Sequence, residues 1–173
     1  GQSMEQVTAY AAVRLFVERA QAAKPGFQLT HSTATVVAEI CRRLNGLPLA
    51  LELAAARVGL LAPSDLRARL DHALGVLVGG PRDAPDRHRT LRATIDWSFN
   101  LLTEAERQAF VRMALLPAGA TVAVAETITG APLDTLDSLV AKQLLIRRGD
   151  RLTMLETVRE YAAEKLTEDP GAD

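Results

Sequence analysis

The sequence predicts a mainly α-helical protein, with four helices followed by a winged-helix unit that contains one small β-hairpin. Apolar residues recur at helical spacing through the first half, as at Ile40 and Leu44, and no alternating strand pattern interrupts them. The convincing hairpin pattern lies near the C-terminus, where residues 144–148 and 151–155 flank the turn Gly149–Asp150. Helices followed by such a hairpin are typical of a winged helix.

The first four helices are expected within residues 4–75, as one helical unit. The first covers 4–23 and ends at Lys24–Pro25–Gly26, because proline and glycine break helices. The residues expected to face inward on it are Val7, Tyr10, Ala11, Leu15 and Phe16.

Capping residues set the limits of the next three helices. Thr30 is a suitable N-cap for a helix that runs to Leu44, and Asn45–Gly46 supplies a left-handed stop. Pro48 opens the third helix, where its missing N–H has no cost, and Pro63 opens the fourth. Short connections between such helices favour a compact bundle.

Residues 76–88 are expected to form a linker, because two glycines and two prolines fall in a short polar stretch. The second unit is expected at 89–167 and a disordered tail at 168–173. Within the second unit, five helices are expected. They cover 89–102, a segment that begins at the capping box Thr103–Glu106, 122–129, 132–142 with Leu133 inward, and 156–166.

Composition limits the function classes. The formal net charge of −1 indicates no general attraction to nucleic acid or to anionic membranes. The single cysteine, Cys41, excludes an internal disulfide and fits a reducing compartment. No apolar stretch reaches the length needed to span a bilayer, so a cytoplasmic location with no membrane association is expected. The three histidines match no zinc spacing, and neither a metal site nor a catalytic residue is expected.

Three segments together resemble one protein family. They are residues 37–57, which contain Gly-Leu-Pro-Leu-Ala-Leu, residues 89–102, which contain Asp-Trp-Ser, and residues 154–162, which begin Met-Leu-Glu. In this order they are similar to STAND-class signalling ATPases, the NB-ARC- and AAA+-like nucleotide switches, and specifically to the bacterial LuxR/AfsR-like regulators. The resemblance implies a helical lid subdomain at 4–75 and a winged-helix subdomain at 89–167.

The family resemblance also implies a nucleotide site. The intact protein would bind ATP or ADP, with Gly46, Leu47 and Pro48 on the adenine side. Met154, Leu155 and Glu156 occupy the place of the family's Met-His-Asp signature, whose histidine approaches the β-phosphate. Leu155 cannot donate that hydrogen bond, so the chain departs from the family pattern there.

The same resemblance sets expectations for activity and partners. The sequence has no G-x-x-x-x-G-K-[ST] loop and no Walker B strand, so this segment is expected to be no enzyme by itself and to bind no nucleotide tightly. Its expected partners are an upstream nucleotide-binding core and an effector domain of the same chain, with oligomerisation on activation.

Two alternatives from other classes stay open. The hairpin arginines Arg147, Arg148 and Arg151 could contact a DNA backbone, which would make the unit an autonomous DNA-binding module. The helix before the hairpin carries Asp134 and Asp137, which would face phosphates, and we therefore disfavour direct DNA contact. The other alternative is a protein-interaction scaffold whose lid presents an apolar groove.

Overall fold

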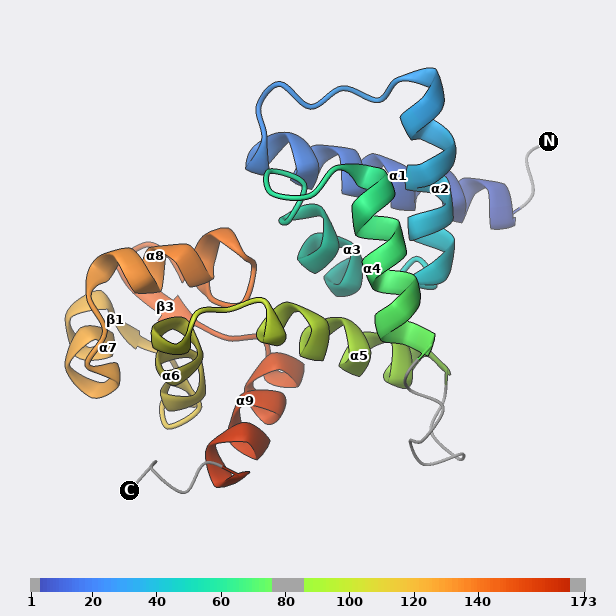
Figure 1. Cartoon of the computed structure of the whole chain (residues 1–173). Coiled ribbons are helices and arrows are strands. Elements are labelled where there is room, and N and C mark those ends of the chain that lie inside the picture. The colour runs from blue at the N-terminus through green and yellow to red at the C-terminus, as the bar shows by residue number, and fades with distance from the viewer. Residues whose placement is uncertain (1–3, 76–85, 169–173) are drawn as a thin grey trace. The chain divides into compact units, whose positions relative to one another are not determined.

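The computed structural model describes residues 4–75 and 86–168. These residues form nine helices and a small three-stranded antiparallel sheet near the C-terminus, so the predicted fold class is confirmed (Figure 1). The chain divides into two compact units, residues 1–98 and 99–173.

The first unit is a bundle of helices. It contains α1 (Met4–Ala23), α2 (His31–Arg43), α3 (Pro48–Ala55), α4 (Pro63–Gly75) and most of α5 (Asp86–Asn100). Helix α1 packs on α2 and α3, and α2 packs on α4 (Figure 1). The largest fully buried side chains of its core are Phe16, Ile40, Leu44, Leu51, Leu53, Leu66, Leu70 and Ile95.

The predicted cap of α2 is confirmed. The Thr30 hydroxyl accepts from the backbone N–H of Thr33 at 3.2 Å, and the Thr33 hydroxyl accepts from the Thr30 N–H at 2.7 Å. This reciprocal pair satisfies donors that the first turn of a helix leaves open. It fixes the start of the helix that leads into the Gly46–Pro48 corner.

The predicted inward face of α1 was wrong at two positions. Tyr10 is 69% exposed and Ala11 is also exposed, whereas Ala12, Phe16 and Ala20 form the buried stripe. Residues four apart share a helix face, and Tyr10 lies about 200° around the helix from Ala12. Apolar residues on both faces of α1 made the sequence pattern ambiguous.

The second unit is a winged helix. Its elements are α6 (Glu104–Met113), β1 (Ala120–Thr121), α7 (Val122–Thr129), α8 (Leu133–Ala141), β2 (Ile146–Arg148), β3 (Arg151–Thr153) and α9 (Glu156–Glu168). Helix α6 packs against α7, α8 and α9, and the sheet order is β1-β3-β2. The capping box at Thr103 is confirmed, but Leu133, expected inward, is exposed.

Strand β1 was not predicted. Its two residues pair with β3 in the register Ala120↔Leu152, which makes β3 the central strand of a three-stranded sheet. Gly119 just before it has φ +76°, and a Cβ there would lie 2.6 Å from the Leu152 carbonyl oxygen. Only glycine permits this approach, and a strand of two residues leaves too short a pattern to recognise.

The boundaries differ in detail from those expected. Of the expected linker 76–88, residues 76–85 lie outside the described residues, and Asp86 already begins α5. The two units divide after Ser98, whereas the second unit was expected from residue 89. Glu168, assigned to the tail, ends α9, and 169–173 are not described.

Among residues 4–75 and 86–168, no helix has the length and apolar character that crossing a bilayer requires.

Candidate functional site

The corner between α2 and α3 has the geometry that its sequence predicts. Asn45 and Gly46 have φ values of +56° and +64°, both left-handed. The Gly46 N–H donates to the Cys41 carbonyl at 2.9 Å, and the Leu47 N–H donates to the Leu44 carbonyl at 3.1 Å. These bonds satisfy the last carbonyls of α2 before Pro48 starts α3.

The residues of this corner differ in exposure. Gly46 and Leu47 are half-buried, and Pro48 is exposed. A Cβ at Gly46 would meet no atom within 4 Å, so the space beside it is open. The corner therefore offers a proline ring and an accessible backbone, which could contact a flat apolar group.

An open groove of about 780 Å³ lies between α1 and α2 and reaches the corner. Its walls are mostly small or apolar residues with a few polar ones, namely Ala9, Ala12, Val13, Thr35, Ala38, Glu39, Cys41, Arg42, Asn45 and Gly46. The structure therefore places Gly46 in the groove, whereas Leu47 and Pro48 do not line it. Grooves of this volume accommodate small organic ligands.

Asn45 also joins the corner to α5. Its side-chain amide donates to the Thr90 hydroxyl at 2.8 Å, and the Thr94 hydroxyl donates to the Thr90 carbonyl at 2.7 Å. Thr90 and Thr94 are both buried. Asn45, whose backbone is left-handed, thus connects the end of α2 to α5.

A buried arginine makes a second connection to α5. Arg57, 3% exposed, donates from Nη2 to the carbonyl of Ser98 at 2.9 Å and to its hydroxyl at 3.0 Å. Arg57 closes the first of the three resemblance segments, and Ser98 belongs to the Asp-Trp-Ser of the second. Two segments that are 41 residues apart at this contact are thus parts of one packed unit.

The described residues support neither a nucleophilic cysteine nor a metal site. Burial raises the pKa of the Cys41 thiol to about 11, against a smaller lowering by a backbone hydrogen bond. A thiol with that pKa stays protonated at neutral pH and is a poor nucleophile. No group of three or more His, Cys, Asp or Glu side chains that could hold a metal occurs within the part of the chain that the structure describes.

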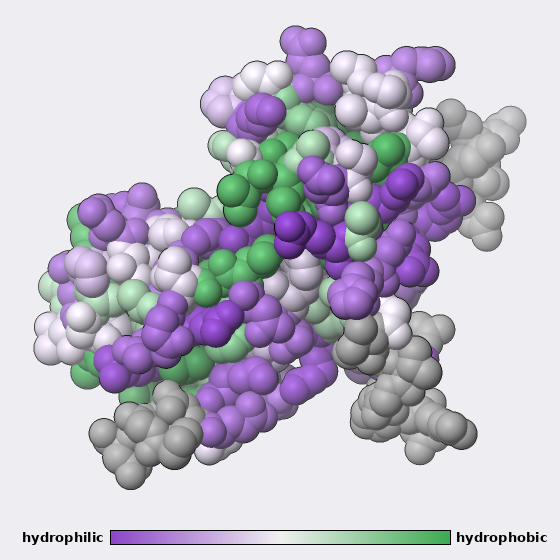
Figure 2. Space-filling view, in the orientation of Figure 1, coloured by the Kyte–Doolittle hydropathy of each residue, from purple (hydrophilic) through white to green (hydrophobic). Residues whose placement is uncertain are grey.

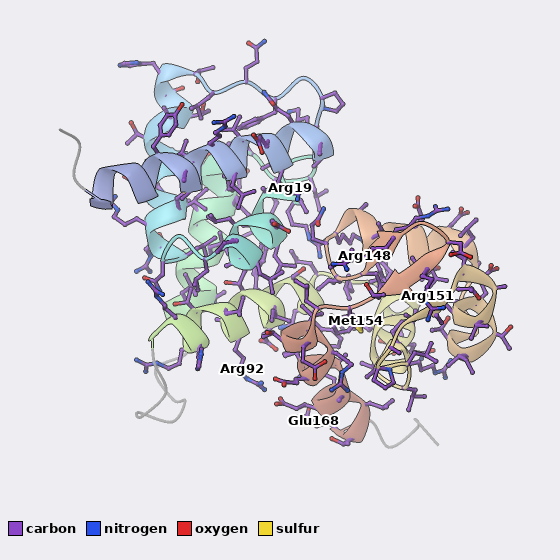
Figure 3. The ribbon with its side chains drawn as sticks, turned by 180° about the vertical axis from the view of Figure 1, so that it is seen from behind. Arg19, Arg92, Arg148, Arg151, Met154 and Glu168 are labelled. Carbon is purple, nitrogen blue, oxygen red and sulfur yellow. The ribbon has the colours of Figure 1, made fainter. Side chains whose placement is uncertain are left out.

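The Met-Leu-Glu segment lies in the second unit, where it joins β3 to α9. Met154, labelled in Figure 3, is half-buried. Leu155 is 39% exposed, and Glu156 starts α9. Both oxygens of Glu156 accept from Arg159, at 2.9 and 2.5 Å, and this hydrogen bonding lowers the pKa of Glu156. Glu156 therefore acts as a helix-start carboxylate in this structure.

A buried carboxylate connects α6 to α8 in the same unit. Glu106 is 5% exposed, accepts from Ser138 Oγ at 2.6 Å and from the Thr103 N–H at 2.9 Å, and pairs with Lys142. Burial would raise the pKa of Glu106, but hydrogen bonds from Lys142, Ser138 and Thr103 lower it to about 2. This network fixes the winged-helix core.

The hairpin arginines stand at the end of the sheet. Arg148 and Arg151 are exposed cross-strand partners on β2 and β3 (Figure 3). Arg147 donates to the Gly149 carbonyl at 3.2 Å, and Arg151 donates to the Gly119 carbonyl at 3.3 Å. Like charges that face each other across strands repel, so the pairing of Arg148 with Arg151 does not stabilise the hairpin.

The structure does not bring all the predicted residues into one described site. Gly46, Leu47 and Pro48 belong to the first unit, and Met154, Leu155 and Glu156 belong to the second. Sequence reasoning missed Arg42, Arg57 and the Asn45–Thr90 contact. Arg57 follows α3 by two residues, and a charged residue directly after that alanine- and leucine-rich run was the available signal.

Comparisons with known proteins give homology to larger regulators. The chain is 43% identical over 173 residues to the Mycobacterium tuberculosis protein named "Putative HTH-type transcriptional regulator Rv0890c" and to its Mycobacterium bovis counterpart Mb0914c, with 94% of the chain aligned. It is 37% identical over 175 residues to "Uncharacterized protein Rv0894" of Mycobacterium tuberculosis. The chain spans about 20% of the length of the first two relatives and about 44% of the third.

No protein-family model matches the chain, and no solved structure matches it. Because the alignments cover most of the chain but only part of each relative, the chain is homologous to one segment of these mycobacterial proteins.

Proposed function

We propose that the chain is the regulatory lid and winged-helix portion of a STAND-type nucleotide switch within a bacterial transcriptional regulator. It would cover bound ATP or ADP and couple the state of that nucleotide to an effector domain. The observation that carries the proposal is the interlocking of the two family-like segments in one unit, through Arg57–Ser98 and Asn45–Thr90.

The contacts with α5 support the proposal because they make the first unit rigid. A lid that reports on a nucleotide must hold its contact residues in one arrangement while the whole unit moves. The Asn45 amide attaches α5 to the Gly46–Pro48 corner, and the buried Arg57 guanidinium attaches α5 to the turn that follows α3. The fully buried core of the unit, including Phe16 and Leu51, supports the same rigidity.

The nucleotide-binding core and the effector domain would lie elsewhere in the parent protein. The length of the mycobacterial relatives supports this part of the proposal, since the aligned segment is about 20% of the longer ones. On this proposal the segment performs no phosphoryl transfer by itself, because neither a phosphate-binding lysine loop nor a magnesium-holding carboxylate is in its sequence.

Photolabelling of a longer chain that carries the upstream core tests the position of the corner. With 8-azido-ADP as probe, we expect the label on the peptide that contains Gly46 and Pro48, and unlabelled ADP should protect that peptide. A chain in which Pro48→Glu introduces an exposed charge should lose label there. Protected labelling confined to other peptides would contradict the proposal.

DNA binding by the winged helix is the second candidate, and Arg148 beside Arg151 is the observation that favours it. The exposed positions of α8 oppose it, because Asp134 and Asp137 stand where a recognition helix needs donors. Titration of a fluorescent duplex at low and at physiological salt separates the two. We expect no binding, whereas salt-sensitive binding abolished by Arg148→Ala and Arg151→Ala would establish the DNA-binding module.

The scaffold alternative uses the groove between α1 and α2. A protein segment could pack against the small apolar residues that line this groove, as a nucleotide could. Calorimetric titration of ADP into a longer chain that carries the upstream core decides between the two.

A further inference from the structure

In the part of the chain that the structure describes, some of the arginines beside the groove form ion pairs with carboxylates, and one does not. Helices α2 and α4 carry a cluster of ion pairs beside it, and Figure 2 shows hydrophilic side chains gathered over these two helices. Within the cluster Arg43 pairs with Asp71 at 2.7 Å, and Arg67 pairs with Glu39 at 2.6 Å. Each of these two guanidinium groups therefore has its own carboxylate.

Arg42 differs from its neighbours. Its side chain is exposed and lines both the apolar groove and the ionic cluster. Among the described residues no carboxylate pairs with it, since Glu39 and Asp71 are used by Arg67 and Arg43. Among the side chains that the structure describes, Arg42 is therefore the groove-lining cation that no carboxylate pairs with.

The walls of the groove supply the other half of a binding surface. Ala9, Ala12, Val13 and Ala38 present small apolar side chains over which a flat ring can lie. Gly46 has no Cβ, and nothing lies within 4 Å of where one would be. A mostly apolar groove with a guanidinium in its lining matches a molecule with a flat apolar part and an attached anion.

We propose that Arg42 binds the phosphate of a nucleoside phosphate whose base lies in the α1–α2 groove. This inference rests on the proposed function and adds a phosphate contact from the lid itself, where the Met-Leu-Glu segment has no histidine. Guanidinium groups bind phosphates through two parallel hydrogen bonds, which suits a residue that carries no other ion pair. The Glu39 carboxylate repels the phosphate little, since Arg67 neutralises it.

Arg42→Gln is the decisive variant, and Arg43→Gln is its matched control. The two positions are adjacent in α2, but Arg43 does not line the groove and its charge is matched by Asp71. The measurement is the affinity of the longer chain with its upstream core for ADP and for adenosine. We expect Arg42→Gln to weaken ADP binding at least about tenfold and to leave adenosine binding unchanged. Arg43→Gln should change neither.

A second variant tests the apolar half. Ala38 is exposed in α2, so Ala38→Leu should narrow the groove without disturbing the core. We expect it to weaken adenosine and ADP binding by the same factor, because both carry the base.

The outcomes separate the two proposals. Wild-type binding of ADP with an unaltered affinity in Arg42→Gln would overturn the role of Arg42 and leave the nucleotide switch intact. An equal loss of adenosine and ADP in Arg42→Gln would also overturn it, since the phosphate would not be the group contacted. Absence of any nucleotide binding by the wild-type longer chain would overturn the proposed function itself. If that chain bound an acidic peptide but neither ADP nor adenosine, the groove would be assigned to a protein segment.

Discussion

Replacing Glu106 by glutamine should destabilise the winged-helix unit, and the size of the loss should depend on pH. Glu106 is buried, and its carboxylate accepts from the side chains of Ser138 and Lys142 and from the Thr103 N–H. Glutamine keeps the shape of the side chain but removes the charge and one acceptor. Ser138 and Lys142 would then face an amide N–H₂ or an uncharged oxygen.

The pKa of Glu106 gives the magnitude. Its value of about 2 lies below the ordinary 4.5, because the hydrogen bonds outweigh burial. At about 1.36 kcal/mol for each pKa unit, the carboxylate stabilises the folded state by about 3 kcal/mol as an upper limit. The Lys142 side chain is 24% exposed, so solvent screens the pair, and we expect a loss of about 1–2 kcal/mol at neutral pH.

The sign of the pH dependence follows from the lowered pKa. The stabilisation is present above the unfolded-state value of about 4.5 and is lost as the pH falls from there through about 2. The wild-type protein should therefore approach the Glu106→Gln variant in stability under acid conditions. Above about pH 6 the difference between the two should be constant.

Urea unfolding followed by circular dichroism, at a series of pH values from neutral to about 3, measures this difference. Glu104→Gln is the matched control, because Glu104 lies in the same first turn of α6 but is exposed, and its effect should stay within about 0.5 kcal/mol. A Glu106→Gln loss that stayed the same from neutral to acid pH would refute the assigned ionisation. A loss no larger than that of the control would refute the network.

Three further predictions concern stability. Ser98→Ala should destabilise the first unit by about 1 kcal/mol in unfolding followed by the fluorescence of buried Trp97, because one of the two hydrogen bonds between Ser98 and the buried guanidinium is lost; an unchanged midpoint would contradict that contact. Gly119→Ala should lower the melting temperature much more than Gly46→Ala, since both have positive φ but only the first places a Cβ against backbone at 2.6 Å, and the reverse order would contradict the close approach. Arg148→Thr should be neutral or stabilise by up to about 0.5 kcal/mol at low salt, less at high salt, and a clear loss would show that the arginine has a stabilising contact.

The elements that sequence reasoning predicted well are those with strong end signals. Thr30, Asn45–Gly46, Pro48 and Thr103 each fix a helix end through a local hydrogen bond or a local backbone preference, and all four are confirmed. Such interactions involve neighbours in the sequence, so their outcome depends little on the rest of the fold.

The features that sequence reasoning missed depend on contacts between distant residues. Strand β1 exists only because Gly119 lets the chain approach Leu152, which is far away in the sequence. The pairing of Arg57 with Ser98 and of Asn45 with Thr90 likewise requires α5 to lie on the bundle. No local pattern determines these partners.

The candidate site was predicted in part. The conformation of Gly46 and the helix start at Pro48 follow from the residue types. The groove beside Gly46 does not follow from the residue types, because it depends on how α1 packs on α2. The absence of an ion pair for Arg42 among the described residues does not follow either, because it depends on which arginines pair with Glu39 and Asp71. The role of Pro48 beside adenine remains a prediction from family resemblance.

Calorimetric titration of ADP tests the nucleotide switch most directly. It should be made on this chain and on a longer chain that carries the upstream core, with Pro48→Glu in the longer chain as the variant. We predict tight binding by the longer chain, weaker binding by its variant, and no measurable heat of binding from this chain alone. A longer chain that is folded but binds neither ADP nor ATP would contradict the nucleotide switch and would leave DNA or protein recognition as the function.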